Sequence, residues 1–383
     1  MLRVVLIANY APDAQPSMQR FADLLHRELA ARGVDVEMWR PPPSVGGRNP
    51  ADGPVHKWLG YVDKYVLYPP RLSQAAARLP DDATTVFHVC DHSNAMYVRC
   101  LRNRPHVVTC HDLIAVRRAL GEFPDVSIRW TGRKLQAMIR SGLRQAHRIV
   151  CDSEATRGDV RRLVGMDAGE TIIRPGVATA FHPVSRDEAA ARLAALKLPA
   201  RFLLHVGGSQ WYKNRIGLLD LYAALLTRAP EAPPIVLAGK PLTSQEASHV
   251  AARRLHDRVI TVASVADSDL AALYSAAELL VFPSLVEGFG WPVLEAMACG
   301  CRVVASNRAP MTEVGGEAAT YLDPQDPVSA SATVAAVLSE PEGDRRARIA
   351  AGLARVSLFS TGAMADAYLA VYHDALARRS HAA

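Results

Sequence analysis

The chain has 383 residues, 49% of them hydrophobic and 21% charged, with a formal net charge of +6. This composition excludes a disordered or fibrous protein, and the length is typical of two domains. No uninterrupted apolar run approaches the ~18 residues of a membrane-spanning helix, and the first apolar run is too short for a signal peptide. We therefore expect a cytoplasmic protein.

Apolar runs of strand length alternate with helical patterns along the first half of the chain. A helix is predicted over 17–32, and an aromatic-rich helix over 57–65. A Pro- and Gly-rich stretch at 41–54 predicts a loop between them. The predicted strands are Arg3–Ala8, Val34–Trp39, Val86–Val89, Val107–Cys110 and Arg148–Cys151.

The same alternation starts again near residue 201, after a predicted linker within 175–183 and a helix near 186–196. It predicts an α/β fold of two doubly wound domains with parallel sheets. Ligands bind such sheets at the carboxyl ends of the strands, so we expect the two domains to face an interdomain cleft that holds the site. The further strands are Arg201–Val206, Ile235–Ala238, Val259–Val262, Leu279–Phe282 and Arg302–Ala305.

Positive charge is concentrated between Arg99 and Arg162, where basic residues exceed acidic ones by eight. Within this stretch, 125–146 predicts a helix with Arg133 and Arg140 on one face and Met138 and Leu143 on another. Such a helix can lie on an anionic membrane, which would suit a lipid-linked acceptor and a peripheral position at the inner face of the membrane. A surface helix packed on its own domain explains the pattern equally simply. Nucleic acid is not expected, because stacking aromatic residues are not interleaved with these charges.

The most informative segment runs from Phe282, at the end of a predicted strand, to Gly300, at a helix C-cap position. It contains Glu287, the loop Gly288-Phe289-Gly290, Pro292 at a first-turn position and Glu295. Glycines and the amides of a helix N-terminus suit a diphosphate, and carboxylates suit sugar hydroxyls. Together these groups predict a nucleotide-sugar site.

This segment closely resembles the retaining glycosyltransferases of family 4, which have the GT-B architecture of two Rossmann-like domains. Glu287 and Glu295 match the two glutamates of that family's motif, with seven residues between them. The resemblance implies that Glu287 binds donor-sugar hydroxyls, that Glu295 binds the ribose, and that the backbone around Gly288 and Phe289 contacts sugar and phosphate.

The resemblance extends to other segments. The pair Gly207-Gly208 followed by Lys213-Asn214 is similar to the family's glycine loop and diphosphate-binding lysine. Many relatives have an arginine beside these residues, and here Arg215 and Lys240 are the candidates to replace it. His111 resembles the family's amino-domain histidine and would approach the donor sugar; Asp112 would bind a hydroxyl or cap the next turn. His111, Lys213 and Glu287 are thus the predicted catalytic residues.

The resemblance implies three segments: an acceptor domain over 1–178, a donor domain over 179–358, and a final helix over 359–383 that returns to the first domain. It also implies transfer of a hexose-type sugar from a nucleotide-diphosphate-sugar to a saccharide or lipid-linked acceptor in glycan or glycoconjugate biosynthesis. The loop at 9–19 departs from the family pattern because it lacks a Gly-Gly pair. The expected chemistry retains the anomeric configuration.

No metal or other cofactor is expected. Cys299 and Cys301 lack a second pair of ligands at zinc spacing, which favours packing. The acidic triplet at 267–269 directly precedes a helical pattern, so an N-cap with an acidic first turn explains it. The alternatives are a sugar-nucleotide epimerase, a sugar-phosphate synthase, and a non-catalytic nucleotide-sugar-binding protein.

Overall fold

The computed structural model describes residues 1–13, 15–46, 54–80, 84–165, 169–263 and 265–382. It divides the chain into two compact units. Unit 1 comprises Met1–Gly176 together with Thr361–Ala383, and unit 2 comprises Val177–Ser360. The divisions that the sequence predicts, after residues 178 and 358, lie close to these boundaries.

Unit 1 is built on a six-stranded sheet in which all paired strands are parallel. Its spatial order is β2-β1-β3-β4-β5-β6. The four inner strands are largely apolar and buried because helices cover both faces of a doubly wound sheet, whereas the edge strands β2 and β6 are more polar and less buried. The six strands are β1 (Arg3–Ile7), β2 (Asp35–Trp39), β3 (Thr85–Val89), β4 (His106–Cys110), β5 (Arg148–Cys151) and β6 (Glu170–Ile172).

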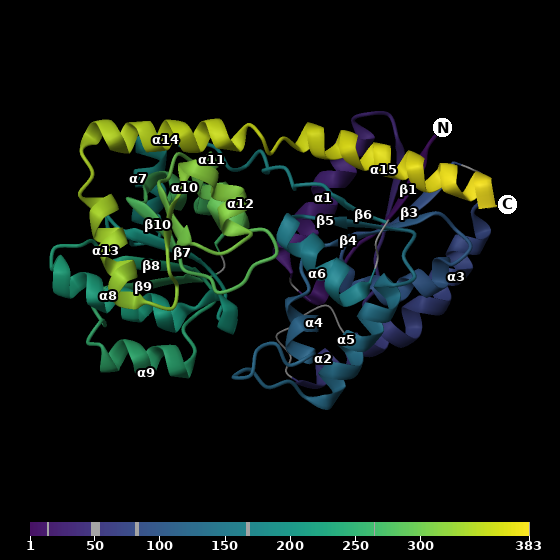
Figure 1. The fold of residues 1–383 in the computed structure, drawn as a ribbon, viewed down its shortest axis with the longest axis horizontal. Helices are drawn as coiled ribbons and strands as arrows, with labels where there is room; N and C mark the ends of the chain where they lie inside the picture. Colours follow the sequence, from purple (N-terminus) through teal and green to yellow (C-terminus); the bar gives the residue numbers. More distant parts are fainter. Residues whose placement is uncertain (14, 47–53, 81–83, 166–168, 264, 383) are drawn as a thin grey trace. The chain divides into compact units, whose positions relative to one another are not determined.

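The helices of unit 1 form a layer on each face of this sheet (Figure 1). Helices α1 (Pro16–Ala30) and α15 (Thr361–Ala382) pack on the face that carries Val4 and Leu6. The face that carries Val5 and Ile7 is covered by α3 (Tyr68–Arg78), η4 (His92–Leu101), α4 (Ile114–Ala119), α5 (Trp130–Leu143) and α6 (Glu154–Val164). The remaining elements are η1 (Ala11–Asp13), α2 (Pro54–Val62) and the π-helix η3 (Asp63–Leu67).

Unit 2 repeats this architecture with the spatial order β12-β11-β10-β7-β8-β9. Its strands are β7 (Leu203–Gly207), β8 (Ile235–Gly239), β9 (Val259–Ala263), β10 (Leu279–Phe282), β11 (Val303–Ser306) and β12 (Thr320–Leu322). Its helices are α7 (Arg186–Ala195), η5 (Trp211–Lys213), α8 (Arg215–Arg228), α9 (Ser244–Ala252), α10 (Asp267–Ala276), α11 (Trp291–Ala298), α12 (Met311–Gly315), η6 (Gly316–Ala318), α13 (Pro327–Leu338) and α14 (Glu342–Val356).

Each sheet has a switch point, where the strand order reverses. In unit 1 it lies between β1 and β3, and in unit 2 it lies between β7 and β10. In doubly wound folds the loops that follow the two switch-point strands diverge to opposite faces of the sheet and leave room for a ligand at its carboxyl edge. The predicted two-domain, parallel α/β fold is confirmed.

Several elements differ from the prediction. The helix predicted over 125–146 begins only at Trp130 and ends at Leu143. The guanidinium of Arg118 donates to the carbonyls of Val126 and Ser127, which a longer helix would use for its own hydrogen bonds. Met138 is 40% exposed and therefore not on the packed face with Leu143. The short strands β6 and β12 were not predicted as strands.

The acidic triplet at 267–269 lies in the first turn of α10, as predicted, but the N-cap residue is Ala266 rather than Asp267. Asp269 forms an ion pair with Arg192 of α7 at 2.7 Å. Cys299 and Cys301 are buried in the apolar core of unit 2. Among the described helices, none has the length and apolar character that crossing a bilayer requires.

Candidate active site

The switch point of unit 2 brings together two of the predicted catalytic residues. Lys213 ends η5, directly after β7, and Glu287 lies in the loop after the adjacent strand β10. The ammonium nitrogen of Lys213 donates to both carboxylate oxygens of Glu287, at 2.8 and 3.0 Å. Their side chains are 15% and 9% exposed. This pair therefore stands where the fold predicts a ligand.

The two loops that carry this pair are joined through their backbones. The amide of Leu285 donates to the carbonyl oxygen of Tyr212 at 2.7 Å. The side-chain amide of Asn214 donates to the carbonyl oxygens of Pro283 (3.1 Å) and Pro324 (2.9 Å). Asn214 has a left-handed backbone, with φ of 56°, which turns the chain from η5 into α8. In this structure the predicted donor residue Asn214 thus connects three loops.

The loop after β10 leads into α11 through glycine and proline. Gly290 has a φ of 104°, which disfavours residues with a Cβ, and it stands at the N-cap position of α11. Pro292 lies in the first turn, as predicted. Phe289 is buried between the rings of Trp291 and Phe359, which holds the backbone of Gly288 and Gly290 in place. The N-terminus of α11 therefore lies in the same loop as Glu287, where its dipole favours an anion.

Glu295 lies one turn inside α11 and is 2% exposed. Its Oε2 accepts a hydrogen bond of 3.0 Å from the hydroxyl of Tyr274 in α10. The structure thus places Glu287 against Lys213 and Glu295 against Tyr274.

Gly207, the last residue of β7, lies next to the side chain of Lys213, and Gly208 follows it. A Cβ on Gly207 would come within 3.4 Å of Lys213 Cδ, and one on Gly208 would meet the flexible end of Gln210. Gly239, at the end of β8, has a φ of 139°, and a Cβ there would lie 2.3 Å from the carbonyl oxygen of Gly207. Only a glycine fits at Gly239, and this close approach shapes the loop that holds Gly207.

Arg215 and Lys240, the two candidates for the missing arginine, have different surroundings. The guanidinium of Arg215 is buried; it donates to the carbonyl oxygens of Gly207 (3.1 Å) and Lys240 (2.9 Å) and lies 3.6 Å from Glu246. Burial lowers the pKa of Arg215, and Glu246 partly offsets that effect. Arg215 therefore stabilises the backbone of the glycine loop through hydrogen bonds. The side chain of Lys240 is exposed.

In unit 1, His111 follows β4 and Asp152 follows the neighbouring strand β5. Nδ1 of His111 lies 2.7 Å from Oδ2 of Asp152, and Nε2 lies 2.9 Å from the carbonyl oxygen of Cys90. Burial alone would lower the pKa of His111, but Asp152, with a contribution from Asp91, raises it to about 9. His111 is thus a buried imidazolium whose two ring nitrogens both donate within unit 1.

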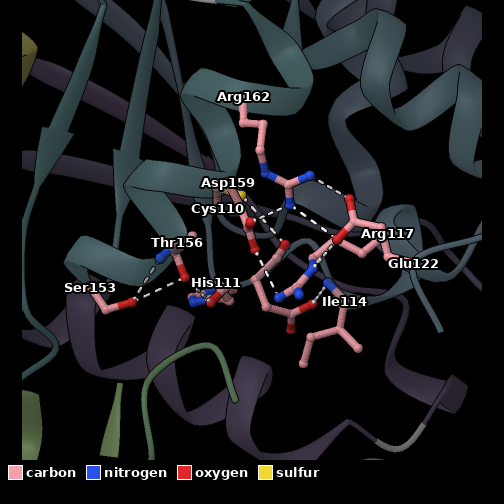
Figure 2. Close-up of polar contacts among 10 residues, drawn as sticks. Cys110, His111, Ile114, Arg117, Glu122, Ser153, Thr156, Asp159 and Arg162 are labelled. Atoms are coloured by element: carbon pink, nitrogen blue, oxygen red, sulfur yellow. Dashed lines mark hydrogen bonds and ion pairs between the residues drawn. The ribbon is translucent and has the colours of Figure 1, made fainter. Parts of the chain in front are cut away.

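Figure 2 shows how the backbone around His111 is held. The hydroxyl of Thr156 donates to the carbonyl oxygen of His111, and Ser153 caps the start of α6 by accepting from the amide of Thr156. Asp112 accepts a hydrogen bond of 2.9 Å from the amide of Ile114. Of the two predicted roles of Asp112, the structure shows the one that organises the next turn.

The same view shows that part of the basic region is neutralised within unit 1 (Figure 2). Glu122 and Asp159 each pair with both Arg117 and Arg162. Hydrogen bonds from Arg162 and Arg117 lower the pKa of Glu122. This network links α4 and the segment after it to α6, so Arg117 and Arg162 stabilise the fold of unit 1.

Sequence reasoning missed a polar cluster at the switch point of unit 1. The side-chain amide of Asn9, after β1, donates to Asp91, after β3, at 2.6 Å, and Asn94 donates to Asn9 at 3.0 Å. Asp152 was also missed. All of these residues stand at or just beyond strand ends of one parallel sheet, and that position was the available signal.

Comparisons with known proteins agree with this architecture. Residues 18–181 match the family model described as "Glycosyltransferase Family 4", and residues 188–352 match the one described as "Glycosyl transferases group 1". Among solved structures, sucrose-phosphate synthase from Thermosynechococcus elongatus superimposes with a TM-score of 0.76 at 24% identity, over 99% of this chain and 100% of that one. Anabaena HepE in complex with UDP and glucose gives a TM-score of 0.73 at 15% identity, over 96% and 98% of the two chains.

Curated relatives that are similar in sequence include three bacterial enzymes. O-antigen chain mannosyltransferase B of Escherichia coli is 30% identical over 64% of this chain and 67% of its own length. D-inositol 3-phosphate glycosyltransferase of Mycobacterium bovis is 31% identical over 79% of this chain and 68% of its own length. The enzyme of that name from Salinispora tropica is 33% identical over 71% and 60%. The chain thus spans about two thirds of the length of these relatives.

The fold and these matches define the chain as a glycosyltransferase of the GT-B class. It belongs to glycosyltransferase family 4. The predicted family and enzyme class are confirmed.

Proposed function

We propose that this protein transfers a hexose-type sugar from a nucleotide-diphosphate-sugar, with retention of the anomeric configuration, in the synthesis of a cell-surface glycan or glycoconjugate. The Lys213–Glu287 pair at the switch point of unit 2 is the observation that carries this proposal. The pair supports the proposal because an ammonium group suits a diphosphate and a carboxylate suits sugar hydroxyls. The names of the relatives and the UDP in HepE support a nucleotide-sugar donor.

In this reaction the ammonium of Lys213 and the amides at the start of α11 stabilise the charge that develops on the leaving nucleoside diphosphate. Glu287 orients the sugar through its hydroxyls, and Glu295 binds the ribose. A catalytic role for His111, which the resemblance to family 4 implies, stays a prediction. Retention follows from the resemblance to family 4 and is tested by the anomeric configuration of the product.

Product analysis tests this proposal directly. A panel of nucleotide sugars is scored by thermal stabilisation, and the best donor is incubated with saccharide and lipid-linked acceptors. We expect a free nucleoside diphosphate and a glycosylated acceptor, and a Glu287→Gln variant that is at least about 100-fold slower. Glu317→Gln, at an exposed position of unit 2, is the matched control. A Glu287→Gln variant with normal turnover would overturn the site.

We also propose that transfer needs no metal. Asp269, in the Asp-x-Asp triplet, is paired with Arg192, and the diphosphate has the organic cation Lys213 instead. Addition of EDTA should therefore leave the transfer rate unchanged. A rate that collapsed with EDTA and returned with Mg²⁺ would exclude this part of the mechanism.

The acceptor is proposed to be lipid-linked, with α5 in contact with an anionic membrane. Trp130, Arg133, Lys134 and Met138 share the exposed face of this helix, at spacings of three and four residues. Lys134 lies over the ring of Trp130 at 4.7 Å. Among the described residues, no carboxylate pairs with Arg133 or Lys134. These cations are thus available to lipid headgroups.

Vesicle sedimentation tests this contact. Vesicles with anionic phosphatidylglycerol should bind the protein more strongly than neutral vesicles, and the combined Arg133→Glu and Lys134→Glu substitutions should remove the difference. Arg27→Glu with Arg228→Glu, two exposed cations outside α5, changes the net charge equally and should preserve binding. Equal losses in both double variants would show that only the net charge matters.

A further inference from the structure

In the Lys213–Glu287 pair, Lys213 already has an anionic partner before a ligand binds. Glu287 accepts two hydrogen bonds from the ammonium group that is proposed to hold the diphosphate. Both side chains are largely shielded from water, so the ion pair is stronger than an exposed one. A carboxylate bound in this way competes with an anionic ligand for Lys213.

The backbone around the pair gives it little freedom to separate by loop movement. The Leu285–Tyr212 bond and the two bonds from Asn214 join the loops independently of the ion pair. An exchange of partners must therefore be made by the side chains.

The two side chains are held unequally. The ammonium of Lys213 also lies over the rings of Phe282 and Tyr212, at 5.3 and 5.7 Å from their centroids. These contacts attract a cation from the side of the aromatic faces. Among the described residues, Lys213 is the only side chain hydrogen-bonded to Glu287. Glu287 is therefore the member of the pair that can turn away at smaller cost.

We propose that Glu287 is an internal competitor of the nucleoside diphosphate for Lys213. When a nucleotide sugar binds, the hydroxyls of its sugar replace Lys213 as hydrogen-bond partners of Glu287. A nucleoside diphosphate lacks this sugar and provides no such replacement. The pair thus favours the substrate over the product, and its closure after transfer expels the nucleoside diphosphate. This inference rests on the proposed function and adds a selection between donor and product at the same site.

A double-mutant cycle measured by calorimetry tests this competition. The probes are UDP and GDP, each compared with UDP-glucose and GDP-mannose. Glu287→Gln should bind the nucleoside diphosphate about tenfold more tightly than wild type, because Lys213 is released. The preference for nucleotide sugar over nucleoside diphosphate should fall in the same variant. Glu317→Gln should match wild type.

Lys213→Met decides between competition and simple charge repulsion. If Glu287 acts by occupying Lys213, Glu287→Gln has no tightening effect when Lys213 is replaced. If Glu287→Gln tightens nucleoside-diphosphate binding equally in the Lys213→Met background, charge repulsion is the cause and the inference is overturned. An unchanged affinity in Glu287→Gln alone would also overturn it. If wild type binds none of the four probes and forms no product, the proposed function itself fails. Circular dichroism confirms that each variant is folded.

Discussion

At the scale of single residues, charge in this protein is decided by the immediate partners of buried groups. His111 and His88 are both buried in unit 1. His88 bonds to the hydroxyls of Tyr372 and Thr109, and burial lowers its pKa to about 3. His111 has the carboxylate of Asp152 instead, and its pKa rises to about 9. The carboxylate of Asp152 is thus the main reason why the pKa of His111 is raised while that of His88 is lowered.

Removal of the Asp152 carboxylate should favour the neutral form of His111. In Asp152→Asn we expect the pKa of His111 to fall below its ordinary value of about 6.5, because burial then dominates. Histidine NMR titration measures this change, with His88 as an internal control that stays neutral. An unchanged titration in the variant would contradict the pairing.

The same pair predicts a pH dependence of stability. A raised pKa in the folded state stabilises the protein fully below about pH 6.5, and that contribution is lost as the pH rises through about 9. The free energy of unfolding of unit 1 should therefore decrease by about 1–3 kcal/mol across this range, and less so in Asp152→Asn. Hydrogen exchange of the strands of unit 1 at several pH values measures it.

At the scale of elements, helix α5 is placed by one close contact. Its Gly142 packs on the backbone of η4, where an added Cβ would lie 2.2 Å from the carbonyl oxygen of Ala95. Ile139 and Leu143 bury the same side of the helix. This contact orients α5, so that Trp130, Lys134 and Met138 face outward. Gly142 lies in the last turn of α5, and the close approach of the helix to η4 explains a glycine at this position.

Two glycine substitutions separate packing from propensity. Gly142→Ala should destabilise unit 1 by about 1–3 kcal/mol because α5 must move away from η4. Gly158→Ala, in α6 with no atom within 4 Å of the added Cβ, should stabilise it by about 0.5–1 kcal/mol. Urea unfolding compares the two. Similar stabilities for both variants would mean that η4 adjusts freely.

At the scale of the whole molecule, the chain completes unit 1 with its last helix. Tyr368 and Tyr372 of α15 are fully buried, and their hydroxyls bond to Thr109 and His88 of the sheet. The core on this face of the sheet combines α1, α15 and strands of unit 1. Unit 1 is therefore complete only after unit 2 has been synthesised.

Deletion of residues 361–383 should unfold unit 1 selectively. The deletion removes α15 from the sheet face that it covers together with α1. Among the described residues, the cores of unit 2 contain none from α15. Limited proteolysis with mass spectrometry should show cleavage within unit 1 and a protected unit 2. A milder variant, Tyr372→Phe, leaves Nδ1 of His88 without its hydroxyl partner and should cost about 1–3 kcal/mol. Equal protection of both units after the deletion would contradict this account.

Local patterns in the sequence were sufficient to predict the two α/β units and most of the strands. They also predicted the loops that carry Lys213, Glu287 and His111. They were sufficient because apolar periodicity and glycine, proline and capping positions act over a few residues. The family motif around Glu287 was readable for the same reason. The start of α5 could not be predicted in this way. The side chain of Arg118, which lies outside α5, takes the carbonyl oxygens of Val126 and Ser127 that a longer helix would use.

Only the tertiary structure decided which distant groups meet. The strand order puts β7 next to β10 and β4 next to β5, and this adjacency pairs Lys213 with Glu287 and His111 with Asp152. The raised pKa of His111 depends on such a long-range contact. The return of the last helix to unit 1, in contrast, was already implied by the resemblance to family 4. Periodicity along a chain specifies what each segment forms, whereas its neighbours are set by how the apolar faces of all segments are buried together.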